Sequence, residues 1–411
     1  MINNENYRKL RDDIRNSLDL SNSMSDTDLR IFIEDAVFNY SLNNVLSSVE
    51  KIDLVKRIFN SLRGYDVLQP LIDDKSITEI MVNSVDQIFI EKNGDITQVP
   101  ISFENQEKLE DIIQSIVAKV NRVVNEFSPI VDARLKDGSR VNVVLPPIAL
   151  NGPAITIRKF PEKPLTIEDL TAKGSLTSNA AEFLRMLITT KYNIFIGGGT
   201  GSGKTTFLNA LANFIPGHER IITIEDSAEL QIKNIPNLIR LETRNPNTEG
   251  KGEITIRELI RTSLRMRPSR IIVGEVRGAE ALDMLQAMNT GHDGSLSTGH
   301  ANSIKDMLSR LETMVLSGAN LPIDVIRKQI SSAIDIMIHL ARIRDHSRRV
   351  VEISEILDIK NGEIQVNPLY LFEEKGETKE GKVIGELIPT GKKLKNRIKL
   401  KMAGYRERDD I

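Results

Sequence analysis

The residues best suited to chemistry form one glycine-rich segment, Gly198-Gly-Thr-Gly-Ser-Gly-Lys-Thr205. A glycine, four variable residues and then Gly-Lys-Thr make the pattern of a phosphate-binding loop. Glycines let backbone N–H groups turn inward around phosphate oxygens, and the start of a following helix adds partial positive charge. We expect Lys204 to reach the β- and γ-phosphates of ATP and the Thr205 hydroxyl to hold Mg²⁺. The sequence therefore predicts a site for ATP and Mg²⁺.

The residues on either side supply the elements that such a loop needs. The apolar run Asn193–Ile196 predicts a buried strand, and Thr206–Phe214 predicts a helix. Strand, glycine loop and helix form the context that distinguishes a nucleotide site from a chance glycine-rich turn. The predicted nucleotide-binding residues are Gly198, Gly199, Thr200, Gly201, Ser202, Gly203, Lys204, Thr205 and Thr206.

Carboxylates follow two further predicted strands. Glu225 and Asp226 come after Ile221–Ile224, and Glu275 comes after Arg270–Gly274. In open α/β sheets ligands bind beyond the carboxyl ends of the strands, so these side chains should converge on the loop. A lone glutamate at a strand end is more often solvated or a helix cap, but two such strands behind a phosphate loop favour catalysis. We expect Glu275 to activate or position the attacking water, while Glu225 and Asp226 hold Mg²⁺ through waters or share the base role. The predicted metal ligands are Thr205, Asp226 and Glu275.

A histidine and three arginines are further catalytic candidates. His300 closes the predicted strand Ser295–Thr298, where it would contact the γ-phosphate or report its loss. The alternative is that His292 and His300 are structural and bond loop carbonyls. An arginine from a neighbouring domain, within a subunit or across an interface, can stabilise charge in the transition state. The candidates are Arg134, Arg140 and Arg158, although each taken alone is more often a surface residue.

Two basic stretches stand outside this chemistry. Arg257, Arg261 and Arg265 recur at helical spacing and predict one cationic helix face, for which a solvated role is favoured over an interface. The run from Lys392 to Lys401 predicts a basic helix. It would meet acidic lipid or a partner, or lie solvated.

Composition bounds the class of protein. The 411 residues are 40% hydrophobic and 27% charged with a net charge of −2, which is ordinary for a globular chain and gives no case for nucleic-acid binding. Cysteine is absent, which excludes disulfides and thiolate zinc sites. Aromatic residues make up only 4% of the chain, which argues against recognition of single-stranded nucleic acid by stacking. A polar start and short apolar runs favour a cytoplasmic protein whose membrane contact is peripheral.

Changes in pattern along the chain predict its domains. Capping signals at Ser25 and Ser47 begin helices of a small bundle, either a docking or regulatory module or a cap on the next domain. An Asn93-Gly94 turn between strand-like runs predicts an α+β domain with an antiparallel sheet. Alternating strands and helices then predict a parallel sheet. The predicted ranges are 1–63 for the bundle, 64–160 for the α+β domain, 161–170 for a linker, 171–370 for the ATPase domain and 371–411 for a polar tail.

These motifs together resemble the secretion and pilus-assembly ATPases of the type II/type IV secretion superfamily. The matching segments are the Walker A loop Gly198–Thr205, the "Asp box" Ile224–Glu229, the atypical Walker B Ile271–Arg277 and the "His box" Thr290–Asn302. Outside the core, three segments resemble the Tad (Flp pilus) branch, the CpaF-type ATPases: Ile77–Asn83, Val131–Asn142 and Ile155–Arg158.

The resemblance implies an α/β protein: a RecA-like P-loop ATPase domain, an N-terminal α+β (PAS-like) domain and a small N-terminal helical bundle. It implies an ATP-hydrolysing motor, a homohexamer that moves inner-membrane platform proteins of a pilus or secretion machine. Such a motor is cytoplasmic, is recruited to the inner face of the membrane and binds no nucleic acid. The family's arginine fingers map onto Arg134 and Arg140, with Arg158 next. Its catalytic glutamate maps onto Glu275, with Glu225 sharing the acid role, and its His-box histidine maps onto His300.

Three other functions remain open at this point. A conjugation or type IV secretion ATPase shares the core motifs. A RecA-like nucleic-acid motor predicts stimulation by DNA or RNA and strong salt dependence. A nucleotide-gated scaffold without turnover predicts missing acids, whereas Glu225, Asp226 and Glu275 are all present.

Overall fold

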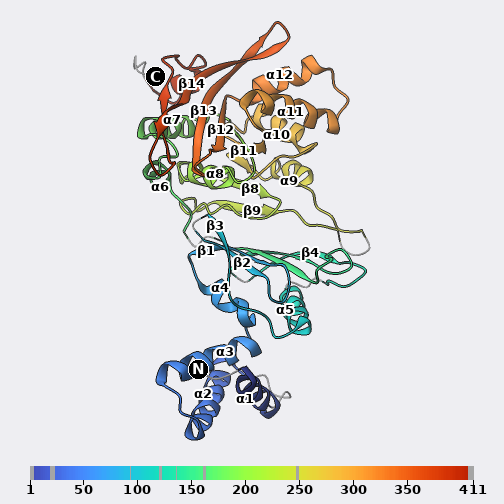
Figure 1. Cartoon of the computed structure of the whole chain (residues 1–411). Helices are drawn as coiled ribbons and strands as arrows, with labels where there is room; N and C mark the ends of the chain where they lie inside the picture. Colours follow the sequence, from blue (N-terminus) through green and yellow to red (C-terminus); the bar gives the residue numbers. More distant parts are fainter. Residues whose placement is uncertain are drawn as a thin grey trace. The chain divides into compact units, whose positions relative to one another are not determined.

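The computed structural model describes residues 4–18, 24–92, 94–119, 123–135, 137–160, 163–246 and 250–405. The chain divides into two compact units, Met1–Pro161 and Glu162–Ile411 (Figure 1). Among the described residues, no helix is both long and apolar enough to cross a membrane.

The first unit begins with helices whose starts the sequence specifies. They are α1 (Asn4–Ser17), α2 (Asp26–Asn43) and α3 (Ser48–Leu62). The Ser25 side chain accepts the N–H of Asp28 at the start of α2, and Ser47 forms a capping box with Glu50 at the start of α3. Each cap satisfies backbone N–H groups that a helix start leaves without partners. Apolar residues from all these helices pack together: Leu10, Ile14, Leu29, Ile33, Val37, Leu54 and Ile58.

The rest of the first unit is an antiparallel sheet with helices. The strand order is β3-β2-β1-β6-β5-β4. The predicted turn residue Asn93 lies outside the described residues, and Lys92 pairs with Asp95 on either side of it. The buried residues of α5 pack against the sheet to make this core. The elements are η1 (Asp66–Leu68), α4 (Gln69–Asp73), β1 (Ile77–Val82), β2 (Ile88–Lys92), β3 (Asp95–Gln98), α5 (Gln106–Ala118), β4 (Ile130–Arg134), β5 (Arg140–Val144) and β6 (Ala154–Arg158).

The second unit is built on one mixed sheet of order β15-β14-β13-β12-β7-β11-β10-β8-β9. Strands from β12 to β9 in this order pair in parallel, as predicted, and β13 to β15 add on in antiparallel pairs. The strands are β7 (Ile194–Gly198), β8 (Ile221–Glu225), β9 (Leu238–Glu242), β10 (Arg270–Val273), β11 (Leu296–His300), β12 (Ile336–Arg342), β13 (Arg348–Lys360), β14 (Glu363–Glu377) and β15 (Val383–Pro389).

Helices cover both faces of this sheet. They are α6 (Ile167–Ala172), α7 (Ser178–Thr189), α8 (Lys204–Ala212), α9 (Ile256–Ser263), α10 (Glu280–Asn289), α11 (Ile304–Gly318), α12 (Ile323–Ala333) and α13 (Ile398–Met402). Alternate residues of β7 point to opposite faces, so Ile194 and Ile196 join α6–α8 in one core while Phe195 joins α9–α12 in another. Burial on both faces explains why the central strands are continuous apolar runs.

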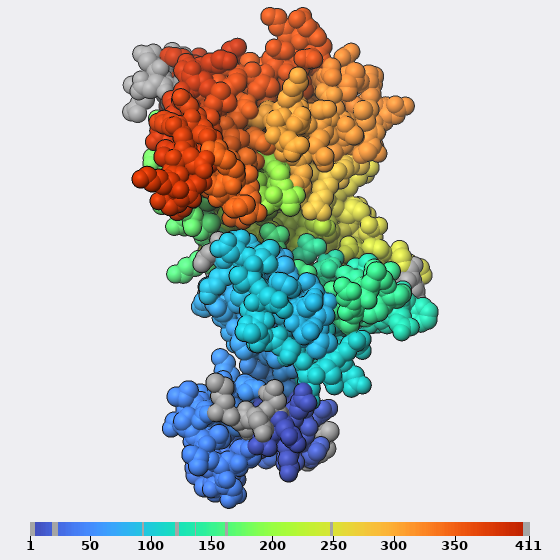
Figure 2. All heavy atoms as spheres, in the orientation of Figure 1, coloured from blue at the N-terminus to red at the C-terminus, as the bar shows by residue number. Residues whose placement is uncertain are grey.

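The C-terminal part of the chain differs from the predicted polar tail. Residues 371–377 belong to β14, and β15 follows, so this region extends the sheet. In Figure 2 the orange and red residues of β13–β15 take up a broad part of this unit's surface. Few residues of this region are buried, among them Tyr370, Val383 and Leu387, and the exposed polar residues between them gave the region its tail-like composition.

The predicted basic helix is also shorter than expected. Only Ile398–Met402 is helical, as α13. Before it, the backbone N–H groups of Lys395 and Asn396 donate to the buried Glu355 carboxylate. A buried carboxylate needs such donors, and here the stretch just before α13 supplies them. In the predicted linker, Pro161 and Glu162 lie outside the described residues, and α6 begins within its range at Ile167.

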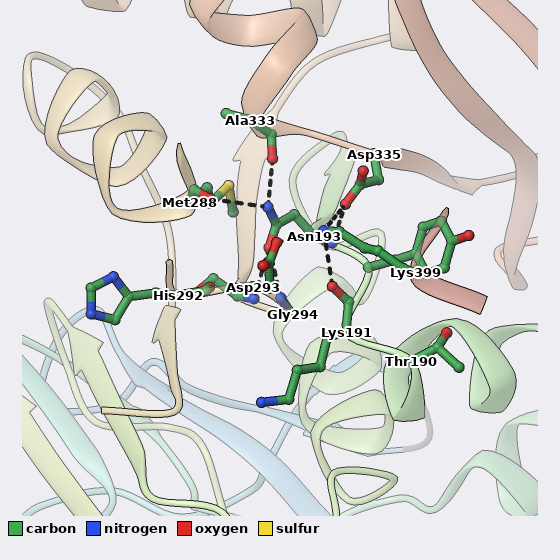
Figure 3. A network of polar contacts seen from close by, with 12 residues as sticks. Thr190, Lys191, Asn193, Met288, His292, Asp293, Gly294, Ala333, Asp335 and Lys399 are labelled. Carbon is green, nitrogen blue, oxygen red and sulfur yellow. Dashed lines mark hydrogen bonds and ion pairs between the residues drawn. The ribbon is translucent and has the colours of Figure 1, made fainter. Parts of the chain in front are cut away.

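A polar network fixes the C-terminal helix to the amino ends of the central strands (Figure 3). The Asn193 side chain donates to the Ala333 carbonyl at 2.7 Å and accepts the N–H of Gly294 at 2.8 Å. Its backbone N–H donates to Asp335, which also lies 2.7 Å from the Lys399 ammonium. Burial raises the pKa of Asp335, and Lys399 opposes that shift. Asn193 therefore joins the starts of β7, β11 and β12, and Lys399 holds α13 against them.

A buried ion pair supports the start of β10. Arg270 is fully buried and donates through Nε and Nη2 to both oxygens of Glu219, each at 2.7 Å. Its Nη1 donates to the Ile188 carbonyl at 2.7 Å. A Cβ at Gly294 would lie 2.5 Å from Arg270 Nη1, so only glycine fits beside this guanidinium. The pair has the two-pronged geometry that suits arginine to carboxylates.

Removing one partner of this pair should be costly. We expect Arg270→Met to lower the free energy of unfolding by about 3–5 kcal/mol, because Glu219 would keep its charge in a buried site. The double variant Arg270→Met/Glu219→Met should recover most of that loss. Urea denaturation of the full chain measures both, and a single variant as stable as the wild type would contradict the expectation.

Candidate nucleotide site

The predicted phosphate loop joins β7 to α8, and its backbone explains its glycines. Gly201 and Gly203 have φ of +71° and +91°, a region that residues with a Cβ adopt at a cost. Gly198 needs its missing side chain for a different reason. A Cβ there would lie 2.6 Å from both the Leu340 carbonyl oxygen and the Ser202 hydroxyl. The loop is thus a close-packed cradle whose shape depends on these positions.

Lys204 points back into this loop. Its ammonium donates to the carbonyls of Gly198 and Gly199 at 3.1 and 3.0 Å and lies 3.2 Å from His300 Nδ1. Burial lowers the pKa of Lys204 from its ordinary value. Phosphate oxygens are stronger partners for an ammonium than neutral carbonyls, so the arrangement favours an anionic ligand.

The predicted catalytic glutamate and histidine lie next to this lysine. His300 ends β11 directly across from Gly198, which places its ring at the loop. Glu275 Oε1 lies 2.8 Å from His300 Nε2, and Glu275 Oε2 accepts a hydrogen bond from Arg277 at 2.9 Å. Oε1 has no well-aligned donor among the described residues. Burial and then the Lys204 charge lower the pKa of His300. Glu275 therefore has one oxygen beside His300, the residue next to the loop, with hydrogen-bonding capacity left.

Glu225 and Asp226 take different positions at the end of β8. Glu225 is 2% exposed, and its Oε2 accepts the N–H groups of Glu229 and Leu230. Burial raises the pKa of Glu225, against the effect of those donors. Asp226 is half exposed and accepts the Thr243 hydroxyl at 2.9 Å. The structure thus ties Glu225 to the fold of its own loop, and its share in the acid role stays a prediction.

Arg277 is a site residue that we did not single out from the sequence. Its guanidinium contacts Glu275 at 2.9 Å and lies 3.9 Å from Asp226. It thereby links the carboxylates that follow β10 and β8. Its place two residues after Glu275 was the only signal available, and spacing alone does not show which way a side chain turns.

Comparison with known proteins assigns the family. Residues 61–399 match the model of the family described as "Type II/IV secretion system protein". The chain belongs to this family. A putative conjugal transfer protein of Mycobacterium tuberculosis is 33% identical over 327 residues, covering 78% of this chain and 92% of the relative. The type IV secretion system protein VirB11 of Brucella suis is 32% identical, covering 70% of this chain and 87% of the relative.

Solved structures support the same fold for this secretion-family protein. The crystal structure of the pilus retraction motor PilT with bound ADP has a TM-score of 0.52 at 20% identity, covering 82% of this chain and 86% of that one. The Legionella pneumophila ATPase DotB has a TM-score of 0.51 at 21% identity, covering 70% and 79%. The predicted α/β, RecA-like ATPase fold is therefore confirmed.

The hydroxyl side chains of the loop and of the first turn of α8 are the remaining predicted residues of the site. Thr205 is half-buried and Thr206 exposed in the first turn of α8, while the Ser202 hydroxyl donates to the Gly199 carbonyl at 2.8 Å. In the described part of the chain, no group of three or more His, Asp or Glu side chains is placed to hold a metal by itself. Mg²⁺ commonly takes one or two protein ligands and completes its shell with phosphates and water. The metal role of Thr205, Asp226 and Glu275 stays a prediction.

The three predicted arginines of the first unit lie side by side at the same end of three neighbouring strands, β4, β5 and β6. Arg134 pairs across the strands with Arg140, and Arg140 pairs with Arg158. Arg140 also lies 3.3 Å from Asp132. Glu79 of β1 lies across from Arg158, so acidic residues accompany this row of like charges. The arginine-finger role stays a prediction.

The cationic face of α9 is not the solvated surface that we favoured. Arg257 and Arg261 donate to the two oxygens of Asp283 on α10, at 2.8 and 2.7 Å. Asp283 is buried, so the pair fastens α9 to α10. Arg265 is exposed. His292 fits the structural alternative, since its Nδ1 lies 3.2 Å from the Ala287 carbonyl oxygen.

Two adjacent glycines provide a matched test of the cradle. We expect Gly198→Ala to abolish or severely weaken nucleotide binding, because its methyl group would collide with Leu340 and Ser202. Gly199→Ala should bind close to normally, since a Cβ there meets nothing within 4 Å. Titration with a fluorescent ATP analogue measures both, and equal affinities for the two variants would refute this account of the loop.

Proposed function

We propose that the protein is an ATP-hydrolysing motor that powers Flp/Tad-type pilus assembly or protein secretion across the bacterial inner membrane. The observation that supports it most is the chain of contacts from Lys204 through His300 to Glu275, with spacings of 3.2 and 2.8 Å. This chain brings a carboxylate to the loop that would hold the γ-phosphate. Membership of the secretion family gives such a site a mechanical use.

The chemistry proposed for this site has few parts. Lys204 exchanges the loop carbonyls for the β- and γ-phosphates of ATP, and the backbone N–H groups of the loop take the remaining oxygens. Glu275 orients the attacking water through the oxygen that lies beside His300. Thr205, Asp226 and Glu275 would hold Mg²⁺, which would supply positive charge to neutralise the phosphates. His300 senses the γ-phosphate because it already contacts both Lys204 and Glu275.

The proposal also gives a role to the three arginines of the first unit. Arg134 and Arg140, and next Arg158, stabilise charge in the transition state from within a subunit or across a subunit interface. The working form is a homohexamer that moves inner-membrane platform proteins. It acts in the cytoplasm at the inner face of the membrane, and nucleic acid is not a substrate. The net charge of −2 and the absence of tryptophan support that exclusion.

A conjugation or type IV secretion ATPase is a second candidate within the same family. The names of the relatives favour it, since they include a putative conjugal transfer protein and VirB11. The segments 77–83, 131–142 and 155–158 favour the pilus branch instead. Deleting the gene and scoring pili and DNA transfer in the same cells separates the two.

Glu275→Gln should separate binding from turnover. We expect the variant to bind ATP with near-normal affinity and to lose at least about a hundredfold in hydrolysis, because an amide cannot take up a proton. Steady-state ATPase assays on protein of checked oligomeric state measure this, with the exposed Glu363→Gln as control. A full rate in Glu275→Gln would move the base role to Glu225. If assembled wild-type protein binds ATP but does not hydrolyse it, the protein is either a nucleotide-gated scaffold or an ATPase that needs its membrane partner for activity.

Mixed assemblies test where the arginines act. If Arg140 works across a subunit interface, mixing Glu275→Gln subunits with Arg140→Ala subunits should restore part of the activity, since some interfaces pair two intact halves. The rate of co-assembled mixtures is compared with that of each variant alone. A lack of recovery in proven co-assemblies would place the arginine and the glutamate of one site in the same subunit.

A further inference from the structure

Two further arginines lie beside the phosphate loop, inside the second unit. β12 pairs in parallel with β7, and Leu340 lies directly across from Gly198. The end of β12 and the start of β13 therefore meet the loop at the same edge of the sheet. Arg342 and Arg348 are cross-strand partners at this point.

Arg348 is already placed against the loop. Its Nε donates to the Gly201 carbonyl at 3.0 Å, and its Cδ lies 3.4 Å from the position of a Cβ on Gly203. Both Arg348 and Arg342 are exposed. Across the described residues, neither forms an ion pair with a carboxylate.

The other arginines of this hairpin are engaged differently. Arg344 pairs with Glu374 and Glu377, at 2.6 and 3.0 Å. Arg349 donates to backbone carbonyls, including that of Gly174 at 2.8 Å. Arg342 and Arg348 are thus the members of the hairpin whose charges face each other across the strands with no acid between them. Such an arrangement is unfavourable unless an anion or an electron-rich ring shares it.

The strand order indicates which part of a nucleotide reaches this pair. Glu275 follows β10 and His300 ends β11, and both strands lie on one side of β7 in the sheet. The hairpin of β12 and β13 lies on the other side. A triphosphate whose γ-phosphate faces Glu275 therefore extends toward the hairpin at its other end. That end carries the α-phosphate, the ribose and the base.

We propose that Arg342 and Arg348 form a binding site for the nucleoside monophosphate end of the bound nucleotide. Arg348 donates to the α-phosphate through the nitrogens that Gly201 does not use, and the Arg342 guanidinium stacks on the base. The planar fork of arginine supports both contacts, which a lysine cannot reproduce. The proposal rests on the proposed function, since it assigns the second half of the same site.

The test compares nucleotides with a ligand that lacks the nucleoside. Calorimetric titrations of the full chain use ATP, ADP and tripolyphosphate, each with Mg²⁺. We expect Arg342→Ala and Arg348→Ala each to weaken ATP and ADP binding by about tenfold, the usual scale for losing one charge-assisted contact. Binding of tripolyphosphate to Arg342→Ala should change less than about threefold. Arg348→Lys should restore only part of the lost affinity.

Arg344→Ala is the matched control. It removes the same charge from the same hairpin, but its partners are Glu374 and Glu377, so nucleotide affinity should stay at the wild-type value. Thermal melts without ligand should show Arg342→Ala and Arg348→Ala to be no less stable than the wild type, because each relieves a like-charge pair.

The outcomes separate this proposal from the function beneath it. Wild-type affinity for ATP in Arg342→Ala and Arg348→Ala would overturn the proposed role of these arginines but not the proposed function. Equal losses for ATP and tripolyphosphate in Arg342→Ala would also overturn it, because Arg342 would then contact the phosphates and not the base. A wild-type chain that binds neither ATP nor tripolyphosphate would overturn the proposed function itself.

Discussion

The position of β7 between β11 and β12 is the constraint on which the site depends. In this register Gly198 has His300 on one side and Leu340 on the other. Both neighbours shape the loop: His300 contacts Lys204, and the Leu340 carbonyl leaves no room for a side chain on Gly198. A shift of either partner by one residue would turn every side chain of that strand to the opposite face. The position of His300 and that of the β12–β13 hairpin are therefore set by the same strand pairing.

Charge in the site is balanced by contacts within the protein. Lys204 rests on loop carbonyls, and Glu275 rests on Arg277 and His300. An incoming phosphate competes for Lys204 and thereby changes the surroundings of His300. Because His300 ends β11 and Glu275 follows β10, that exchange acts on two neighbouring strands of the sheet. The loop and the acid are coupled through the histidine and not by direct contact.

Short sequence patterns were enough to single out the phosphate loop and the residues next to it. Contacts between residues far apart in the sequence could not be predicted in this way. The phosphate loop, Glu275 and His300 stood out because their types and spacing suffice, and the caps at Ser25 and Ser47 depend on residues three positions away. By contrast, Asp283 lies 22 residues from Arg261, so its role in fastening α9 was invisible. In α3 both Val49 and Leu54 are apolar, and only the packing of the bundle shows that Leu54 is buried and Val49 exposed. The strands after residue 371 escaped for a similar reason, since a half-exposed hairpin has a polar composition.

The anchoring of α13 has a consequence for how the chain is made. Lys399 neutralises Asp335, and Leu394 and Leu400 belong to the core that also contains Ile194 of β7. During synthesis the first unit can fold early, because its strands all lie before residue 161. The second unit must wait until residues near 400 have left the ribosome before Asp335 gains its counter-charge. Until then the core that Leu394 and Leu400 complete stays open, and exposed apolar surface of this kind makes incompletely folded chains prone to aggregate.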